Sequence, residues 1–289
     1  MKIKILIPVY NDWQSVFKLI EEIDQLQISD EFQISIIIVN DASNHDRTTE
    51  EKKFKSIQSI KILNMIKNQG HARCIATGLK YLYEKDDFEY IIPMDGDGED
   101  RPEEIRDFLN KIKDSNNKPI VGVRVKRSES LKFKICYILH KLFTLVFTGQ
   151  LIKFGNFTCL PKSVVEKMIN EKATWNSFSG SLKKIGGNLE SIPSVRGKRY
   201  FGPSKMSFYN LIKHSLSIIS VFRKTFLIRS ALFIILYILL IKSNASIITA
   251  IPIVCLLVAV YLISNLSLRE NLEEFKNSLK QITNIDIIQ

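Results

Sequence analysis

Cysteine is scarce in this chain. The four cysteines, Cys74, Cys136, Cys159 and Cys255, are scattered and show no Cys-x-x-Cys spacing. A disulfide framework and a zinc site both need paired or closely spaced cysteines, so the sequence indicates neither. The four histidines do not cluster either.

Acidic residues are absent between Glu190 and Glu270, although the whole chain carries 41 basic and 30 acidic residues and a net charge of +11. Such an excess of positive charge raises the question of nucleic-acid binding. The basic residues of this stretch, however, flank an apolar segment. Their placement points to an anionic membrane surface and to phosphate-bearing ligands, and we expect no nucleic-acid partner.

Two long apolar runs, Phe226 to Ile241 and Ala245 to Ile263, are separated by only three residues. The second is long enough to span a bilayer, and the first is short, with Arg229 placed near its start to reach the interface. We therefore expect a transmembrane hairpin over residues 226–264. A buried helical hairpin in a soluble domain is the alternative, but hardly any polar face survives on either segment.

Positive charge is concentrated on one side of this hairpin. Several Lys and Arg residues precede it, whereas its turn carries only Lys242. The positive-inside rule then predicts an integral membrane protein with both termini in the cytoplasm. No signal peptide is recognisable before the first strand, so we expect the portion that precedes the hairpin in the cytoplasm as well. The mixed-charge residues 265–289 are expected to be a cytoplasmic tail that forms a short surface helix.

The stretch 90–103 reads YIIPMDGDGEDRPE and holds the strongest chemical signal. An apolar run ends in an Asp-Gly-Asp turn, and Pro102 then opens a helix. Residues two apart on an extended backbone project to the same side, so Asp95 and Asp97 should face one space. Two such carboxylates can hold Mg²⁺ or Mn²⁺, with substrate phosphates completing the metal's oxygen shell.

An Asp-Gly-Asp-Gly sequence is also typical of a calcium-binding EF-hand loop. That loop needs Gly at its sixth position and Glu at its twelfth, where this chain has Asp100 and Arg106, so an EF-hand is excluded. A purely structural role stays open at this point, in which the acidic turn caps the helix that begins at Pro102.

Apolar runs at residues 3–8, 34–39, 60–65 and 90–94 alternate with helical patterns, and a fifth run follows at 119–123. This alternation predicts an α/β fold with a mostly parallel sheet. Polar residues follow the first four runs, at the edge where open α/β sheets bind ligands. We expect them to form one nucleotide crevice; they are Tyr10, Asp12, Asn40, Asp41, Gly70, His71, Asp95 and Asp97.

Between this region and the hairpin lie two amphipathic stretches and a basic loop. Residues 131–150 are apolar but interrupted by Lys and His, which suits a helix at the membrane interface or, equally, an ordinary core-facing helix. Residues 206–225 are expected to be a juxtamembrane amphipathic helix. The loop 196–205 reads RGKRYFGPSK and suits an anionic ligand.

Residues 3 to about 125 resemble a family 2 glycosyltransferase of the GT-A fold. The resemblance rests on ILIPVYND, IIIVNDAS, NQGHARCIATGL and MDGDGEDRPEEI, in the expected order and spacing. The second half, with GNFTCLPKSVVEKM, RGKRYFGPSKMSF and two terminal apolar segments, is similar to the branch that includes dolichyl- and polyprenyl-phosphate sugar transferases. This resemblance implies a GT-A domain over residues 1–205.

The resemblance also implies roles for individual residues. Pro8, Tyr10 and Asp12 would line the nucleoside pocket, with Asp41 on the base. Asp95 and Asp97 would be the metal and diphosphate pair, and the phosphates of donor or acceptor would be served by Arg199, Ser204 and Lys205.

Two positions depart from the pattern of this family. Asn40 stands where the family often has Asp. The stretch 155–158, Gly-Asn-Phe-Thr, lacks the arginine that many polyprenyl-phosphate transferases carry just after the aromatic residue. The first departure concerns the contact with the nucleotide base, and the second concerns the identity of the acceptor.

The expected reaction moves a sugar from a UDP- or GDP-sugar to a polyprenyl phosphate, and the resemblance implies that it proceeds with inversion. A lipid phosphate is already ionised and needs no general base, and the chain is poor in acids between residues 130 and 269. Transfer to a hydroxyl, with Glu99 or Asp100 as base, and a catalytically silent nucleotide-binding anchor are the alternatives. Deleting residues 226–289 should release a soluble domain that still binds nucleotide. The sequence is compatible with a homo-oligomer.

Overall fold

The computed structural model describes residues 1–45, 47, 53–126, 131–203 and 208–289. Ser204 and Lys205, two of the expected phosphate-binding residues, lie outside these ranges. The chain divides into two compact units. One comprises Met1–Ser128, Lys153–Lys205 and Asn271–Gln289, and the other comprises Glu129–Ile152 and Met206–Glu270.

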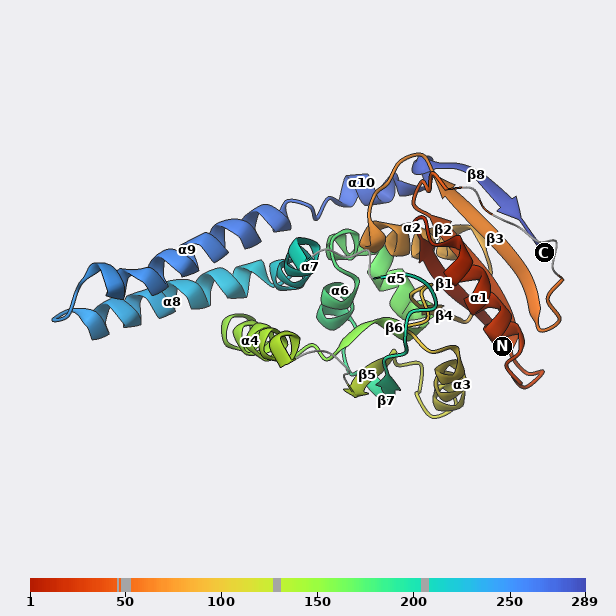
Figure 1. Cartoon of the computed structure of the whole chain (residues 1–289), viewed down its shortest axis with the longest axis horizontal. Coiled ribbons are helices and arrows are strands. Elements are labelled where there is room, and N and C mark those ends of the chain that lie inside the picture. The colour runs from red at the N-terminus through yellow and green to blue at the C-terminus, as the bar shows by residue number, and fades with distance from the viewer. Residues whose placement is uncertain (46, 48–52, 127–130, 204–207) are drawn as a thin grey trace. The chain divides into compact units, whose positions relative to one another are not determined.

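The first unit is built on a mixed sheet. Within the described residues it has eight strands in the order β7-β5-β6-β4-β1-β2-β3-β8 (Figure 1). The strands are β1 (Lys2–Val9), β2 (Gln33–Asn40), β3 (Ile57–Met65), β4 (Tyr90–Pro93), β5 (Ile120–Lys126), β6 (Phe154–Pro161), β7 (Glu190–Val195) and β8 (Ile282–Ile287). The neighbours β4, β1, β2 and β3 run parallel, which confirms the predicted mostly parallel α/β sheet. Strands β6 and β8 are antiparallel to their neighbours.

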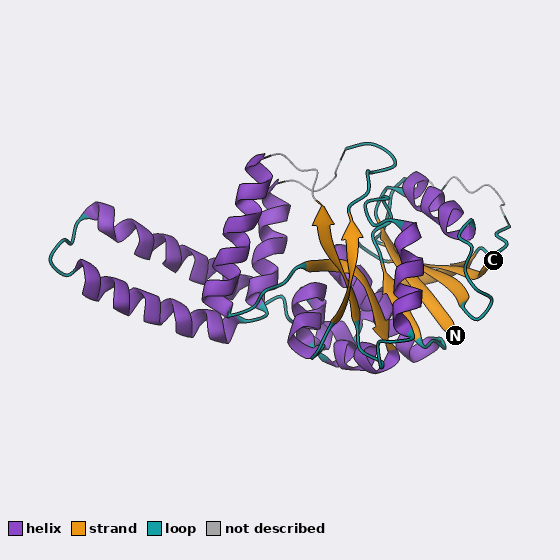
Figure 2. Ribbon diagram, turned by 90° about the horizontal axis from the view of Figure 1, so that it is seen from below, coloured by secondary structure: helices purple, strands orange, loops and turns teal. Residues whose placement is uncertain are grey.

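Helices cover both faces of the sheet (Figure 2). They are α1 (Trp13–Asp24), α2 (His71–Lys85), α3 (Ile105–Ile112), α5 (Lys162–Asn170), α6 (Phe178–Ile185) and α10 (Leu272–Lys276), with short 3₁₀ turns at Pro102–Glu104, Lys172–Trp175 and Ser278–Gln281. Because side chains alternate along a strand, Ile5 and Ile7 of β1 pack with α1 and α3, whereas Leu6 packs with α2. The near-continuous apolar runs read from the sequence are therefore strands buried on both faces.

Helix α2 lies close against β1 because of Gly78. A Cβ on this glycine would lie only 2.4 Å from Cδ1 of Leu6. The close approach fixes the position of α2 on the sheet, and with it the position of its first residue, His71. That residue belongs to the edge where the parallel strands end.

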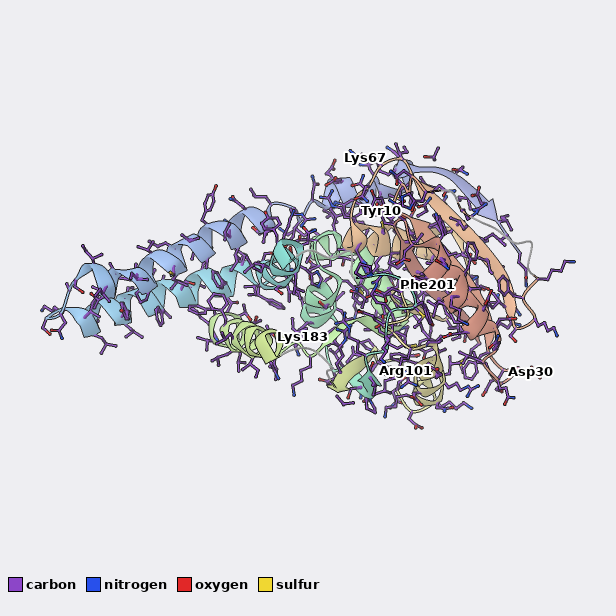
Figure 3. The ribbon with its side chains drawn as sticks, viewed as in Figure 1. Tyr10, Asp30, Lys67, Arg101, Lys183 and Phe201 are labelled. Carbon is purple, nitrogen blue, oxygen red and sulfur yellow. The ribbon has the colours of Figure 1, made fainter. Side chains whose placement is uncertain are left out.

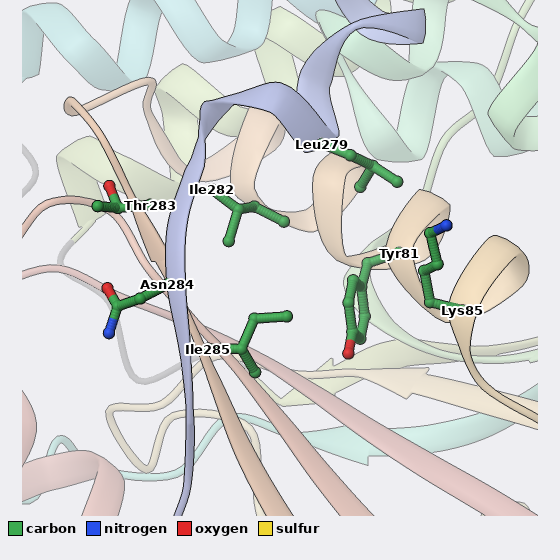
Figure 4. A pocket seen from close by; sticks show the side chains of 7 residues that line it. All are labelled: Tyr81, Lys85, Leu279, Ile282, Thr283, Asn284 and Ile285. Carbon is green, nitrogen blue, oxygen red and sulfur yellow. The ribbon is translucent and has the colours of Figure 1, made fainter.

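The C-terminal segment belongs to the sheet unit. After α10 and the turn at Ser278–Gln281, β8 pairs antiparallel with β3, from Met65 opposite Ile282 to Lys61 opposite Ile287. Figure 4 shows Ile282 and Ile285 pointing toward Tyr81 of α2, and Asn284 pointing away. The expectation of a tail with only a short surface helix is therefore wrong: the helix is present, but a strand of the sheet follows it.

The second unit contains α4 (Leu131–Thr148), α7 (Phe208–Ser220), α8 (Arg223–Ile241) and α9 (Ile247–Ser267). Helices α8 and α9 are long and apolar enough to cross a membrane, in agreement with the predicted pair of spans. Phe143 and Phe147 of α4 pack against Phe226 of α8. Arg229 donates a hydrogen bond of 2.8 Å to the carbonyl of Val146, so it caps the end of α4, a contact not foreseen when Arg229 was expected only to reach the interface.

Candidate functional site

Three neighbouring parallel strands end at the same edge of the sheet and deliver the expected site residues there. Tyr10 and Asp12 follow β1, Asn40 ends β2, and Asp95 and Asp97 follow β4. The side chain of Tyr10, labelled in Figure 3, is 45% exposed and open to a ligand. The carboxyl ends of these strands thus bring the expected polar residues to one edge of the sheet, where open α/β sheets bind ligands.

The loop after β4 holds its aspartates in different ways. Backbone N of Asp95 donates to Oδ2 of Asp100 at 2.9 Å, and Oδ1 of Asp97 accepts from backbone N of Glu99 at 2.9 Å. The 3₁₀ turn at Pro102 follows Arg101 and has no side-chain cap. Asp95 and Asp97 therefore do not cap the helix at Pro102, which removes the structural alternative raised by the sequence.

Asp95 faces the first residue of α2. Among the described residues, Oδ1 of Asp95 is buried and accepts no hydrogen bond, yet it lies 3.1 Å from Nε2 of His71. The same imidazole nitrogen lies 3.1 Å from Nδ2 of Asn156 on β6. His71 is thus brought to Asp95 as expected, while Asn156 is an additional member of the site.

Negative charge is concentrated in this loop. Burial, and secondarily the charge of Asp95, raise the pKa of Asp97 to about 6, and Arg199 opposes that rise. Burial, and then the charge of Asp95, also raise the pKa of Asp100 well above its ordinary value. A cation placed among these carboxylates would relieve the repulsion.

Residues 196–201, here called the basic strap, lie across the Asp-Gly-Asp loop. Backbone N of Gly197 donates to the carbonyl of Glu99 at 2.8 Å, and backbone N of Tyr200 donates to the carbonyl of Asp97 at 2.9 Å. Gly98 has φ of +86°, and a Cβ there would lie 2.7 Å from the Tyr200 ring. The glycine therefore lets the aromatic ring rest directly on the loop.

Arg199 connects the strap to two strand ends. Its guanidinium donates to Oδ2 of Asp12 at 2.7 Å and pairs with Oδ2 of Asp97. The other oxygen of Asp12 accepts from the hydroxyl of Ser15 at 2.7 Å. The structure thus brings Asp12, Asp97 and Arg199 together, although they are far apart in the sequence.

Asp41 follows β2 and contacts the turn before α2. It is only 4% exposed, and its two oxygens accept from the backbone N of Gln69 at 2.6 Å and of Gly70 at 2.9 Å. Asp41 therefore fixes the turn before α2, and its role on the base stays a prediction. Pro8 lies within β1 opposite Val39, short of the sheet edge.

Sequence reasoning missed two residues near the site, one on a strand that it did not predict and one on a strand that it did. Asn156 lies on β6, and Arg124 on β5 lies 3.9 Å from Oδ1 of Asp100. The apolar run Phe157 to Leu160, broken by Thr158, was the available signal for β6, but the neighbouring Gly155 and Asn156 resemble a turn. Arg124 directly follows a predicted strand, so its position at the end of that strand was visible in the sequence.

The residues present fit a divalent cation that a substrate helps to hold. The described residues contain no group of three or more His, Cys, Asp or Glu side chains able to enclose a metal ion. Two nearby carboxylates, one with a buried oxygen that accepts no hydrogen bond, offer the hard oxygen ligands that Mg²⁺ and Mn²⁺ prefer. Phosphate oxygens and waters would have to supply the rest of the shell.

Comparison with known proteins places these features in a family. The sequence profile of Glycosyl transferase family 2 matches residues 4–175. The chain is 25% identical, over 73% of its length, to undecaprenyl-phosphate 4-deoxy-4-formamido-L-arabinose transferase of Klebsiella pneumoniae, of which it spans 64%. It is also 25% identical, over 73% of its length, to the bactoprenol glucosyl transferase of Shigella phage SfV, of which it spans 68%.

Solved structures share the fold at low sequence identity. Glucosyl-3-phosphoglycerate synthase from Mycobacterium tuberculosis gives a TM-score of 0.54 at 10% identity, over 78% of this chain and 79% of that one. The mannosyltransferase from Pyrobaculum calidifontis, in complex with GDP-Man and Mn²⁺, gives 0.51 at 12% identity, over 96% and 85%. These neighbours confirm the expected GT-A fold. With its site at the strand ends and this profile match, the chain belongs to glycosyl transferase family 2.

Proposed function

We propose that the protein transfers a sugar from a UDP- or GDP-sugar to a polyprenyl phosphate, with Mg²⁺ or Mn²⁺ held by Asp95 and Asp97. One observation carries this proposal: the guanidinium of Arg199 joins Asp12 and Asp97 at the carboxyl edge of the sheet. A cation bound to the carboxylates and a diphosphate bound to the guanidinium could therefore lie next to each other at this edge of the sheet. The names of the relatives, which act on undecaprenyl phosphate or bactoprenol, support the lipid acceptor.

Each side chain would have a defined task. Tyr10 and Asp12 would border the nucleoside, because they follow the central strand β1. Departure of the nucleoside diphosphate builds negative charge on its β-phosphate, and Arg199 lies where it could stabilise that charge. A divalent ion, when bound, would act as a Lewis acid toward the same phosphate. His71 and Asn156 would border the sugar on the other side of Asp95.

A phosphate acceptor fits because the two acids considered as general bases are engaged. Glu99 pairs with Arg196, and Asp100 is buried and accepts from backbone N of Asp95. Neither carboxylate is placed to take a proton from a hydroxyl. An ionised phosphate needs no such group. Arg124, which lies beside Asp100, would add positive charge that attracts the acceptor phosphate.

A hydroxyl acceptor is the second candidate, and His71 is the observation that favours it. Its imidazole lies 3.1 Å from Oδ1 of Asp95, and a carboxylate beside a histidine can orient that ring as a general base. His71→Gln would separate the two candidates. Transfer to a phosphate should survive this change, whereas transfer to a hydroxyl should fall by about two orders of magnitude or more.

The apolar helices α8 and α9 would anchor the enzyme in the membrane where its lipid acceptor resides. We propose the orientation that puts the sheet unit and both termini in the cytoplasm, since basic residues are frequent before α8 and the turn between the helices has only Lys242. Cysteine labelling from each side of sealed vesicles would test this orientation. Labelling of residue 243 from the cytoplasmic side would contradict it.

The function is tested by incubating purified protein with radiolabelled sugar nucleotides, Mg²⁺ or Mn²⁺, and undecaprenyl phosphate. Label in a lipid that mild acid cleaves supports the proposed reaction. Label only in a lipid stable to both mild acid and alkali supports the hydroxyl acceptor. No turnover with any donor, together with unchanged nucleotide affinity in Asp97→Ala, would leave a silent nucleotide-binding anchor.

A further inference from the structure

Side-chain amides form a continuous hydrogen-bonded row across three strands of the sheet. Nδ2 of Asn64 on β3 donates to Oδ2 of Asp286 on β8 at 3.1 Å. Nδ2 of Asn40 on β2 donates to Oδ1 of Asn64 at 2.8 Å. Oδ1 of Asn40 in turn accepts from backbone N of Ser43 at 3.0 Å. The row, here called the amide ladder, therefore links the C-terminal strand to the turn after β2.

The carboxylate of Asp286 fixes the direction of the amide ladder. An ionised carboxylate only accepts hydrogen bonds, so Asn64 must turn its NH₂ group toward it. The carbonyl oxygen of Asn64 then faces Asn40, which must donate in its turn. This leaves Oδ1 of Asn40 as the acceptor for Ser43. An ionised Asp at position 40 could not donate to Asn64.

At its far end the ladder supports the two loops that border the nucleoside in the proposed site. Backbone N of Asn11 donates to Oγ of Ser43 at 2.9 Å, and Oδ1 of Asn11 accepts from backbone N of Asn44 at 3.0 Å. Asn11 has φ of +53° and Ala42 has φ of +55°. Residues other than glycine adopt such backbone angles less readily, so the surrounding hydrogen bonds must hold Asn11 and Ala42 in this conformation. Tyr10 and Asp12 flank Asn11 directly.

Asp286 also holds this segment by a second route. Oδ2 of Asp286 accepts from the guanidinium of Arg47 at 2.9 Å, and Oδ1 accepts from Nδ2 of Asn284 at 2.8 Å. Arg47 stands four positions after Ser43 in the chain. One carboxylate on the last strand is thus bonded to the ladder and to a residue near the loop that the ladder supports.

We infer that Asp286 is a positioning residue for the sugar-nucleotide donor, and that it acts through Asn64 and Asn40 on the loops at residues 10–12 and 41–45. This inference rests on the proposed function, because the loops are assigned to the nucleoside there. It gives the segment after the membrane helices a task in donor binding. It also explains Asn40, since this ladder needs a donor at that position.

The direction of the ladder supplies a specific test. In Asn40→Asp, two acceptors meet whichever way Asn64 turns, either at residue 40 or at residue 286. Adding Asp286→Asn allows the row to run in reverse, with residue 286 donating to Asn64 and Asn64 donating to residue 40. The NH₂ group of residue 286 then faces Arg47 as well, so the Arg47 contact is lost and the repair of the ladder is partial. The matched control is Asn40→Asp with Asp30→Asn, because Asp30 is an exposed acid outside the ladder and this double variant has the same net charge.

The experiment measures transfer by the full-length protein in detergent or nanodiscs, with KM determined separately for the sugar nucleotide and for undecaprenyl phosphate. Asn40→Asp and Asp286→Ala should each raise the donor KM about tenfold and leave the acceptor KM unchanged. Asn40→Asp with Asp286→Asn should lower the donor KM again, by about threefold relative to Asn40→Asp alone, since the ladder is restored but the Arg47 contact is not. The control with Asp30→Asn should not.

Four outcomes would overturn the inference. The first is an unchanged donor KM in Asn40→Asp, and the second is a double variant with Asp286→Asn whose donor KM is as high as that of Asn40→Asp alone. The third is an equal decrease of the donor KM in the control double variant with Asp30→Asn. The fourth is an equal rise of the donor and acceptor KM that follows the fall in melting temperature. Each of these requires an active wild type. If the wild type neither transfers sugar nor binds UDP or GDP, the proposed function fails and this inference fails with it.

Discussion

Arg199 bridges Asp12 and Asp97, two carboxylates that follow neighbouring strands but lie 85 positions apart in the chain. Arg199→Ala removes the guanidinium that faces the proposed diphosphate, so kcat should fall by about 10²- to 10³-fold. Arg199→Lys should recover only part of this loss, because an ammonium cannot bridge two carboxylates as a guanidinium does. Steady-state transfer assays measure both. Arg106→Ala, an exposed arginine on α3, should behave as wild type.

The raised pKa of Asp97 predicts a pH dependence of stability in the metal-free protein. Its folded value of about 6 lies above the unfolded value. The stability that this group contributes is therefore fully present below pH 4 and is lost as the pH rises through about 6. Asp97→Asn, which cannot ionise, should melt at a higher temperature than wild type at pH 7.5, and the difference should shrink by pH 5. A difference that grows toward acid would contradict this assignment.

Gly98 tests the contact between the basic strap and the Asp-Gly-Asp loop. Gly98→Ala should destabilise the protein by about 2–4 kcal/mol, because it combines a left-handed backbone with a Cβ 2.7 Å from the Tyr200 ring. Gly187→Ala is the matched control, since Gly187 also has a positive φ, of +63°, but nothing lies within 4 Å of its Cβ. It should cost about 1 kcal/mol and leave activity intact. Chemical denaturation and transfer assays measure the two effects; equal costs would mean that the strap does not rest on this glycine.

Glu274 tests whether the C-terminal segment is part of the sheet unit. Its carboxylate pairs with Arg73 of α2 at 3.1 Å and accepts from Nε1 of Trp175 at 2.9 Å. Glu274→Ala leaves a mostly buried arginine without its carboxylate and should cost about 2–3 kcal/mol of unfolding free energy. Glu273→Ala, on the exposed side of the same short helix, should cost less than about 0.5 kcal/mol.

The same contacts revise the deletion expected from the sequence. Removing residues 226–289 would take away β8 and Glu274 together with the membrane helices. We now expect that truncated chain to misfold or to lose nucleotide binding. The sequence alone did not reveal this because β8 is short, lies at the edge of the sheet, and pairs with β3 across more than 200 positions of the chain.

The central sheet could be predicted because its strands are long apolar runs with polar ends, and both signals are local. The same locality explains why the polar residues at the strand ends could be named as candidates, whereas their contacts could not be predicted. In the sequence, Asp41 looks the same as an exposed ligand. Only the fold shows that its carboxylate accepts hydrogen bonds from the turn at Gly70. Likewise, Asn156 and Asp286 lie on β6 and β8, two strands that local patterns did not reveal.

The most direct test of the account is isothermal titration of the full-length protein with UDP and GDP, with and without Mn²⁺. We predict that one of the two nucleotides binds in the presence of Mn²⁺, that omitting the metal weakens binding at least tenfold, and that Asp97→Ala abolishes the effect of the metal. Equal binding with and without Mn²⁺, or binding unchanged by Asp97→Ala, would contradict the proposal that this edge of the sheet holds a metal-bound sugar nucleotide.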